Sequence, residues 1–400
     1  MRQTWRWFGP DDPVTLDNAK QAGAQGIVTA LHHLYDGRSW RLEDVVERRR
    51  IIEAAGLSWD VCESIPVSDA IKRRDGVWRR DIDAWKDSLA NLVRAGVRTV
   101  CYNFMPIVDW TRTDLRYPTS AKGLALRFDF PAFVAYDAFV LRRPGAEQDY
   151  PAAALSAARA RFAELDAQAF AVIEKNVIGG MPARQSEYNR AQFAEALSAF
   201  AGLTADDLRA NLLAFVGEIG PMAEELGARL ALHPADPPIS LFGLPRVAST
   251  AADYRALFAA APSPANGITL CAGSLGSRPD NDLVAMAREF GPRVHFAHLR
   301  NVAREADGSF VEAEHLSGDV DMVALVRALL DEEKRRRNAG RADAEIPMRP
   351  DHGHLLADDI GKARINPGYS HVGRLKGLAE LRGVMRAFEW IDANSRQLTG

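Results

Sequence analysis

The stretch "SLANLVRAGVRTVCYNF", residues 88–104, joins a charged helical run to a short apolar segment through a single glycine. The glycine stands where the C-terminal cap of a helix needs a positive φ angle. The apolar residues after it form a continuous run, which is typical of a parallel strand that is buried on both faces. The stretch therefore predicts one helix-to-strand unit of an α/β protein.

The same arrangement recurs along the chain, for example in "ERRRIIEAAGLSWDVCES" at 47–64 and in "PMAEELGARLALHP" at 221–234. Counting every segment of this kind gives eight expected strands, at residues 4–8, 26–31, 58–63, 99–104, 229–233, 268–271, 294–298 and 346–351. Helical patterns lie between them, and one more follows near residues 372–388. Eight such units predict a (β/α)8 TIM barrel, with residues 1–400 forming a single domain. A doubly wound open sheet is the structural alternative, but it usually has fewer units.

One connection between the expected strands is far longer than the others. Residues 105–203 contain no expected strand, but "PAAALSAARARFAELDAQAFAVIEKN" at 151–176 and "SEYNRAQFAEALSAF" at 186–200 have helical spacing. Long connections inside a compact domain are usually functional. We therefore predict a helical insertion after the fourth strand, on the face of the barrel that carries the active site.

Composition limits the class of protein. The chain of 400 residues is 47% hydrophobic and 26% charged, with a net charge of −3, so binding to nucleic acid or to an anionic membrane is not expected. The start "MRQTWRWFGPDDP" lacks the apolar core of a signal peptide, and no stretch approaches the ~20 apolar residues of a membrane span. Three cysteines cannot form a disulfide framework, so we expect a cytoplasmic protein. Barrels of this size often pair, which predicts a homo-oligomer.

Four consecutive expected strands, the fifth to the eighth, end in a residue that can bind a metal. These residues are His233, Cys271, His298 and Asp351. Each has a structural explanation when taken alone, since a free cysteine, for example, is usually a small buried hydrophobe. Catalytic groups of such barrels gather at the carboxyl ends of the strands, so all four are expected at one mouth. Two imidazoles, a thiolate and a carboxylate form a plausible set for one divalent ion.

The motif "RPDHGH" at 349–354 allows three interpretations. His352 and His354 stand two residues apart and could form a metal-binding pair on one strand face. Alternatively, Asp351 binds the metal and His352 transfers protons. The third interpretation is a polar loop without a chemical role.

Other strand ends offer polar groups for a hydroxylated ligand. Asn103 and Glu63 end the fourth and third expected strands, and Arg300 and Asn301 follow His298. Arg300 could hold a carboxylate in bidentate fashion. Two further residues, Trp110 and Arg112, begin the insertion as candidate lid contacts, and Tyr369 follows the turn Pro367-Gly368 as a candidate proton donor or acceptor.

The remaining histidines are weaker candidates. His295 lies three residues before His298, so its side chain is expected on the opposite strand face, toward the helices. His315 is a candidate to reach the active site from the loop after the seventh strand. Three others are weaker still: His32 and His33 end the second strand, and His371 opens the last helix.

The chain resembles the mannonate dehydratase family of xylose-isomerase-like barrels, which acts in hexuronate breakdown. The resemblance covers essentially the whole chain, through "RWFGPDDPVTL", "ESIPV", "CYNFMPIVDWTRTDL", "HPADPPISLFGLPR", "NGITLCAGSLGS", "RPDHGH" and "PGYSHVGRLKGLAELRG". It implies that His233, Cys271, His298 and Asp351 bind Mn(II) or Fe(II), and that His352 and Tyr369 transfer protons. It also implies the dehydration of D-mannonate to 2-keto-3-deoxy-D-gluconate. His354 is then left with a supporting or loop role.

This reaction needs a base to remove the C2 proton and an acid to protonate the leaving C3 hydroxyl. A metal that coordinates the carboxylate and a neighbouring hydroxyl would stabilise the enediolate. The interpretation that we favour from the sequence puts Tyr369 near C2 and His352 near the C3 hydroxyl. An aldose–ketose isomerase or epimerase is the nearest alternative, but such enzymes usually collect several Glu and Asp ligands. A sugar-acid binding protein without activity is the alternative from another class.

Overall fold

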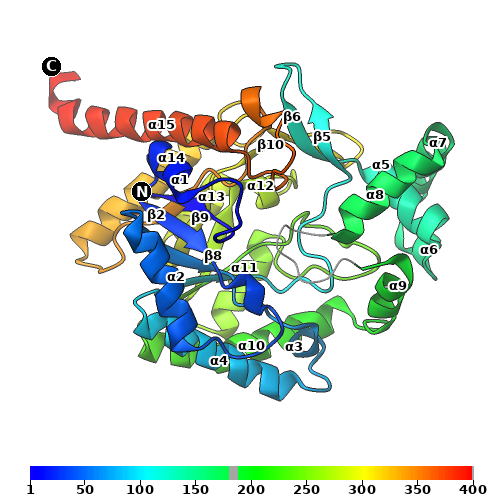
Figure 1. The fold of residues 1–400 in the computed structure, drawn as a ribbon, viewed down its shortest axis with the longest axis horizontal. Coiled ribbons are helices and arrows are strands. Elements are labelled where there is room, and N and C mark those ends of the chain that lie inside the picture. The colour runs from blue at the N-terminus through cyan, green and yellow to red at the C-terminus, as the bar shows by residue number, and fades with distance from the viewer. Residues whose placement is uncertain (180–187, 399–400) are drawn as a thin grey trace.

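The computed structural model of the protein describes residues 1–179 and 188–398. Eight parallel strands close into a barrel in the order β1-β12-β9-β8-β7-β4-β3-β2. Figure 1 labels β2, β8 and β9 among them, with helices on the outside. These strands are β1 (Arg2–Arg6), β2 (Gly26–Thr29), β3 (Ser58–Glu63), β4 (Thr99–Tyr102), β7 (Arg229–Leu232), β8 (Asn266–Cys271), β9 (Val294–His298) and β12 (Pro347–Arg349). The prediction of a (β/α)8 barrel is confirmed, and all eight expected strands coincide with or overlap an observed one.

The quoted stretch folds as expected. Helix α4 (Trp78–Arg94) ends just before Gly96, which has a φ angle of +88°, and β4 begins at Thr99. Any residue other than glycine would be strained at this φ angle. The strand then pairs with β3 on one side and with β7 on the other, and all four of its residues are buried.

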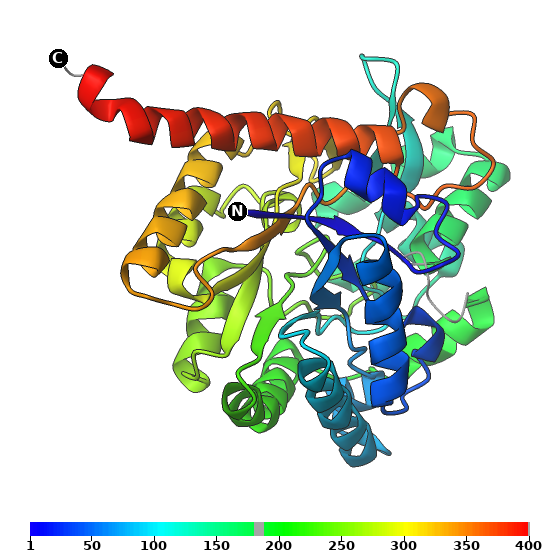
Figure 2. The same cartoon turned by 60° about the vertical axis from the view of Figure 1, so that its left-hand side comes forward.

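Helices surround the barrel (Figure 2). They are α1 (Leu16–Gln21), α2 (Leu42–Ala54), α3 (Asp69–Arg73), α4, α10 (Ala205–Glu225), α11 (Ala251–Ala260), α12 (Ala272–Leu275), α13 (Leu283–Phe290), α14 (Met322–Asn338) and α15 (His371–Leu398), with short turns η1 (His32–Leu34), η3 (Gly291–Arg293) and η4 (Ala357–Asp359). The large apolar core lies between these helices and the strands. Inside the barrel a second cluster is formed by Val28, Val61, Cys101, Ala231 and Phe296, one from each of five strands. Side chains therefore fill the barrel interior.

The predicted insertion after the fourth barrel strand is present, and its described part contains α5 (Phe130–Ala135), η2 (Tyr136–Leu141), α6 (Ala146–Asp149), α7 (Ala152–Glu164), α8 (Ala167–Gly179) and α9 (Arg190–Ser198). Residues 186 and 187 of the expected second helix lie outside the described residues. A second large apolar core joins the insertion to neighbouring segments, and it includes Phe133 and Phe193 of the insertion and Phe242 from the segment after β7.

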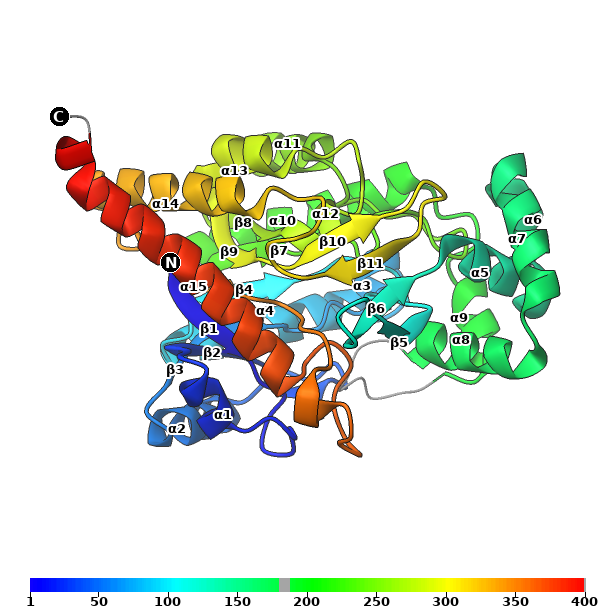
Figure 3. The ribbon, with the colours of Figure 1, turned by 90° about the horizontal axis from the view of Figure 1, so that it is seen from above.

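The insertion is not purely helical, which corrects the prediction that residues 105–203 contain no strand. It begins with a hairpin of β5 (Asp114–Pro118) and β6 (Leu124–Phe128). This hairpin joins β10 (Asn301–Arg304) and β11 (Phe310–Ala313) in an antiparallel sheet of order β10-β11-β6-β5. We call these four strands the added sheet. Figure 3 shows it between the barrel and the helices of the insertion.

None of the helices that the structure describes is long and apolar enough to cross a membrane.

Candidate active site

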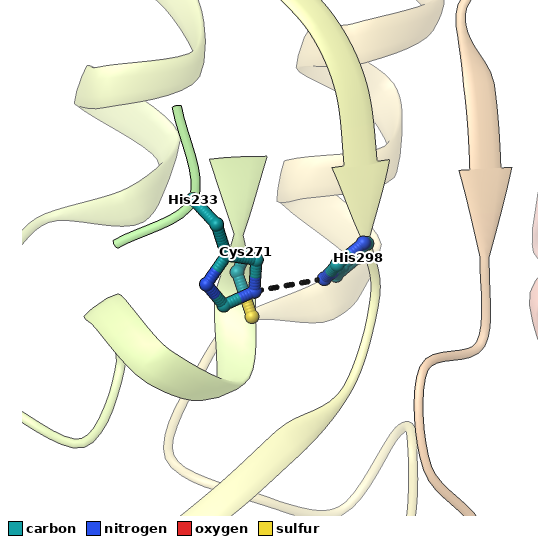
Figure 4. A group of neighbouring side chains, drawn as sticks. All are labelled: His233, Cys271 and His298. Carbon is teal, nitrogen blue, oxygen red and sulfur yellow. Dashed lines mark hydrogen bonds between the residues drawn. The ribbon is translucent and has the colours of Figure 1, made fainter. Parts of the chain in front are cut away.

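Three neighbouring strands of the barrel bring His233, Cys271 and His298 together at their carboxyl ends (Figure 4). Each of the three residues offers one possible ligand atom, and these three atoms lie within 4.8 Å of one another. Among the described residues, these three form the group that could hold a metal ion. Side chains alternate between the two faces of a strand, which explains why His298 of β9, and not His295, belongs to the site. Phe296 and His298 share the inner face, whereas His295 faces outward and lies 3.0 Å from the Pro264 carbonyl oxygen. We call His233, Cys271 and His298 the donor group.

Both imidazoles of the donor group are suited to bind a metal as neutral ligands. Burial lowers the pKa of His233, and burial together with the Arg349 guanidinium holds the pKa of His298 well below its usual range. His233 Nδ1 lies 2.7 Å from the Pro234 carbonyl oxygen, to which it can only donate. Its Nε2 lone pair therefore points toward His298 Nδ1, 3.1 Å away.

The thiol of Cys271 is fully buried. Burial raises its pKa to about 12, and the neighbouring Asp351 carboxylate acts in the same direction. The Ser274 amide donates to Sγ over 3.4 Å, and Sγ lies 3.1 Å from Ser274 Oγ. A thiol of this kind ionises readily only beside a strong positive charge, and a coordinated divalent cation supplies one. The donor set thus fits a divalent metal in its chemistry as well as in its geometry.

Asp351 lies beside the donor group, two residues after β12 ends. One carboxylate oxygen is 3.8 Å from Cys271 Sγ, and the other is 3.8 Å from His298 Nδ1. The carboxylate is held by Arg349, and Arg300 Nη1 lies 3.2 Å from Oδ2. Its φ angle of +69° is uncommon for a residue other than glycine, and it turns the chain at this point. Asp351 is therefore close enough to complete the set, although it is not one of the three residues in the donor group.

A pocket opens above these residues at the barrel mouth. Its lining consists of Arg6, His32, Tyr35, Glu63, Ser64, Cys101, Tyr102, Asn103, Met105, Asp109, Trp110, His233, Asp236, Arg300, Arg349, Asp351, His352 and Tyr369. The lining combines polar and charged groups with a few apolar walls, which suits a small hydroxylated acid.

His352 and Tyr369 meet in this pocket. His352 Nε2 lies 3.3 Å from the Tyr369 hydroxyl, and the two rings are packed edge to face with their centroids 4.9 Å apart. Trp110 packs against the same imidazole with 5.8 Å between the centroids. Burial raises the pKa of Tyr369, so its phenol carries a proton at neutral pH. The two residues are thus in hydrogen-bonding contact beside the donor group.

Glu312 contacts the other side of the His352 ring, and it did not emerge from the sequence. Its carboxylate oxygens lie 3.0 and 2.9 Å from His352 Nδ1. Burial alone would raise the pKa of Glu312, but Arg300, His352 and Arg112 lower it to about 2. The sequence does hold one signal for its strand, because the Asp307-Gly308 pair is typical of a hairpin turn between β10 and β11.

Arg300 is buried among acidic groups. Its Nη2 donates to Asp236 over 2.7 Å, and its Nη1 lies 3.2 Å from Glu312 and 3.2 Å from Asp351. Gly273 makes room for this side chain, because a Cβ at that position would lie 1.9 Å from Arg300 Nε. Arg300 lines the pocket as expected, but it contacts three carboxylates of the protein itself.

Glu63 and two arginines, Arg6 and Arg349, form a further charged group in the lining. Glu63 accepts from Arg349 over 2.9 Å and lies 3.2 Å from Arg6; burial alone would raise its pKa, but these two cations lower it to about 2. Arg349 also donates to His298 Nε2 over 3.0 Å. Of the four charged residues Glu63, Arg6, Arg349 and Asp236, the sequence pointed only to Glu63.

The remaining candidates divide into those that line the pocket and those that do not. Asn103, Trp110 and His32 line it. Asn301 is fully buried, and its amide is bonded to the backbone of His315, Val302 and Val320, which assigns it a structural place and removes it as a substrate ligand.

Two other expectations are corrected. Arg112 is fully buried in ion pairs with Asp236 and Glu312, so it is no lid contact. The ring of His315 lies against the Pro350 carbonyl oxygen at 2.8 Å, where it supports the chain behind β12. His354 has the supporting place expected of it, since its Nε2 lies 2.7 Å from the carbonyl oxygen of Glu312.

Comparisons with known proteins agree with one another. A family described as D-mannonate dehydratase (UxuA) matches residues 1–395. The chain is 54% identical over 389 residues to mannonate dehydratase 2 of Agrobacterium fabrum, covering 97% of this chain and 98% of that protein. It is 53% identical over 389 residues to mannonate dehydratase of Saccharophagus degradans, with the same coverage of 97% and 98%.

The structural comparisons extend this result. The crystal structure of mannonate dehydratase from Streptococcus suis serotype 2 has a TM-score of 0.76 and 32% identity, covering 99% of this chain and 95% of that chain. A xylose isomerase domain protein from Planctomyces limnophilus has a TM-score of 0.50 and 11% identity, with 98% of each chain covered, and so shares the fold alone.

Proposed function

The chain belongs to the D-mannonate dehydratase family, and we propose that it removes water from D-mannonate to give 2-keto-3-deoxy-D-gluconate. The observation that best supports this proposal is that His233 of the donor group and Asp351 line the same pocket as the His352–Tyr369 pair. A dehydration of this kind needs a positive charge that stabilises the substrate carboxylate. It also needs a base at one carbon and an acid at the adjacent carbon.

We propose that His233, Cys271, His298 and Asp351 hold one divalent ion, Mn(II) or Fe(II). The ligand types would suit Zn(II) as well, so the choice rests on the family resemblance. When bound, the ion polarises the carboxylate of the substrate and makes the C2 proton more acidic. Turning of the Asp351 carboxylate toward the ion would release Arg300 Nη1 from its 3.2 Å contact. Arg300 would keep its contacts with Asp236 and Glu312 and could also contact the substrate, with Asn103 as a second polar contact on the pocket wall.

The direction of proton transfer follows from the tautomer of His352. Both Glu312 oxygens and Arg300 Nη1 lie within hydrogen-bonding distance of Nδ1, but a carboxylate can only accept and a guanidinium can only donate. If Nδ1 carried no proton, its lone pair would face the Glu312 carboxylate, which is repulsive. Arg300 does not need Nδ1 as an acceptor, because its Nη1 can donate to Glu312 and to Asp351. The proton therefore belongs on Nδ1, and Nε2 accepts from the Tyr369 hydroxyl.

This tautomer reverses the roles that we favoured from the sequence. We propose that His352 Nε2 removes the C2 proton. The protonated Tyr369 hydroxyl then donates to the departing C3 hydroxyl, which leaves as water. The resulting enol tautomerises to the ketone.

The acidic groups argue against the alternative of a sugar isomerase or epimerase. Such enzymes usually gather several carboxylates on their metals, but Glu63, Asp236 and Glu312 are paired with arginines here. Cytoplasmic location and a homo-oligomeric state remain predictions.

The test is an assay of metal-depleted protein with D-mannonate, before and after Mn(II), Fe(II) or Zn(II) is added. We expect no turnover after chelation and formation of a 2-keto-3-deoxy acid once Mn(II) or Fe(II) is restored. Absence of a 2-keto acid with every metal and every hexonate tried would reject the proposal.

A further inference from the structure

The added sheet reaches the chemistry of the barrel through one side chain. Strand β11 alternates between buried and half-buried residues, so Phe310 and Glu312 share its buried face. Phe310 packs on Phe128 of β6, with 5.7 Å between the ring centroids, and Glu312 points to the barrel mouth and contacts His352. A residue outside the eight barrel strands thus contacts the proposed base.

The position of Glu312 is fixed at both its backbone and its side chain. Its carbonyl oxygen lies 2.7 Å from His354 Nε2, and its neighbour across the sheet is Val302 of β10. Arg112 donates to its Oε1 through Nε over 3.1 Å and through Nη2 over 2.8 Å. The side chain of Glu312 is only 3% exposed, so its carboxylate cannot relax into solvent when a partner is removed.

Arg112 is itself held from the other side. Its Nη1 donates to Asp236 over 2.8 Å, and Asp236 in turn accepts from Arg300 over 2.7 Å. Two arginines, Arg112 and Arg300, and two carboxylates, Asp236 and Glu312, therefore form a buried network that contacts His352 through Glu312 and Arg300 and contacts Asp351 through Arg300. Because every member has a partner of opposite charge, the network can hold a single arrangement.

We propose that Glu312 is a positioning residue that fixes His352 in the tautomer with the proton on Nδ1 and Nε2 free toward Tyr369. The inference rests on the proposed function for its effect on turnover, but the tautomer itself does not depend on the reaction. In a barrel without the added sheet, Arg300 would be the remaining charged contact to Nδ1, and its donation would favour the opposite tautomer. The added sheet is thus part of the catalytic apparatus.

Two substitutions test this inference. Glu312→Gln removes the charge and keeps the shape, while Glu312→Asp keeps the buried charge for Arg112 and withdraws the carboxylate from His352 by one methylene. We expect kcat to fall about 10- to 100-fold in both variants, with KM and the bound metal unchanged. Glu305→Gln is the matched control, because Glu305 forms an exposed 2.8 Å ion pair with Arg127 near the same sheet and should keep full activity.

If Glu312 only balances the charge of Arg112, then Glu312→Asp will have the kcat of the parent protein, and the inference is wrong. A second measurement is independent of turnover. In the zinc-loaded protein with ¹⁵N-labelled histidine, the His352 signal, assigned by its loss in His352→Asn, should report a proton on Nδ1. The ¹⁵N signal that reports this proton on Nδ1 of His352 should change in Glu312→Asp and stay the same in Glu305→Gln. An unchanged signature would overturn the inference, whereas a parent protein with this signature and no dehydratase activity would reject only the proposed function.

Discussion

The barrel rim and the added sheet contribute different things to one pocket. The rim supplies the donor group from three adjacent parallel strands, in which Cys271 and His298 are direct neighbours. The added sheet supplies Glu312, whose carboxylate contacts the proposed base and the arginines Arg112 and Arg300. The difference suggests that metal binding belongs to the barrel, whereas the orientation of the proton-transfer pair depends on the addition. Substitutions in the two regions should therefore separate metal content from turnover.

The largest effect is expected for Cys271→Ser in the rim. A buried serine hydroxyl is a much poorer ligand than a thiolate, so the protein should lose bound metal and turnover together. Metal content measured by elemental analysis, alongside the dehydratase assay, would show this.

Cys62→Ser is the matched control. Cys62 is also fully buried and also lies on a barrel strand, but it packs in the outer core. The Cys62→Ser variant should lose some stability through its buried hydroxyl but keep its metal. Full activity of a metal-loaded Cys271→Ser variant would contradict the ligand assignment.

The next effect in size is expected for His352→Asn. This substitution removes the proposed base but none of the proposed ligands, so turnover should fall about 10²- to 10⁴-fold while metal content stays normal. Exchange of the C2 proton of D-mannonate with solvent deuterium should be lost in the same variant. If exchange continues at the parent rate, His352 is not the base, and Tyr369 would take that role.

A pair of phenylalanine substitutions compares the regions directly. Phe296→Ala opens the barrel floor under His298, where the ring centroids are 4.5 Å apart, and Phe128→Ala opens the packing of the added sheet. Each should cost about 3–5 kcal/mol of unfolding free energy. Urea unfolding and a metal titration would be measured for both. Only Phe296→Ala should weaken metal binding. Equal weakening in both variants would contradict the proposal that metal binding depends on the barrel and not on the added sheet.

The smallest effect concerns acid stability, in which the two regions should agree. The pKa of Glu63 in the barrel and that of Glu312 in the added sheet are both lowered to about 2. A carboxyl with a lowered folded-state pKa stabilises the fold above its unfolded pKa of about 4.3, and this contribution is lost as the pH falls toward the folded value. Unfolding free energies measured from about pH 6 to pH 3 should therefore fall less steeply in Glu63→Gln and in Glu312→Gln. Unchanged slopes would contradict the lowered pKa values.

The sequence was sufficient for the barrel because each barrel unit repeats one local pattern. A helix that ends at a glycine such as Gly96, followed by a continuous apolar run, needs no distant contact to be identified. The rule that active sites lie at the carboxyl ends of the strands then brought His233, Cys271, His298 and Asp351 into one place. His352 and Tyr369 were expected there as well, and the structure places them in contact.

The added sheet could not be predicted in this way. Strands β5 and β6 are short and half-exposed, and β11 reaches β6 across more than 180 residues of chain, so its pairing depends on contacts that no local pattern reveals. The position of Glu312 beside His352 depends on that pairing, so it could not be predicted either. Arg349, at the end of β12, and Asp236, in a loop, were overlooked for another reason, since charged residues are usually solvated, and only the structure shows that both are buried.

Cobalt substitution shows directly whether the donor group binds the metal through Cys271. Co(II) bound through a thiolate gives a sulfur-to-metal charge-transfer band in the near ultraviolet. We expect this band in the parent protein, in Cys62→Ser and in His352→Asn, and we expect its loss in Cys271→Ser. A parent protein without the band, or a band that survives in Cys271→Ser, would contradict the assignment of Cys271 as a metal ligand.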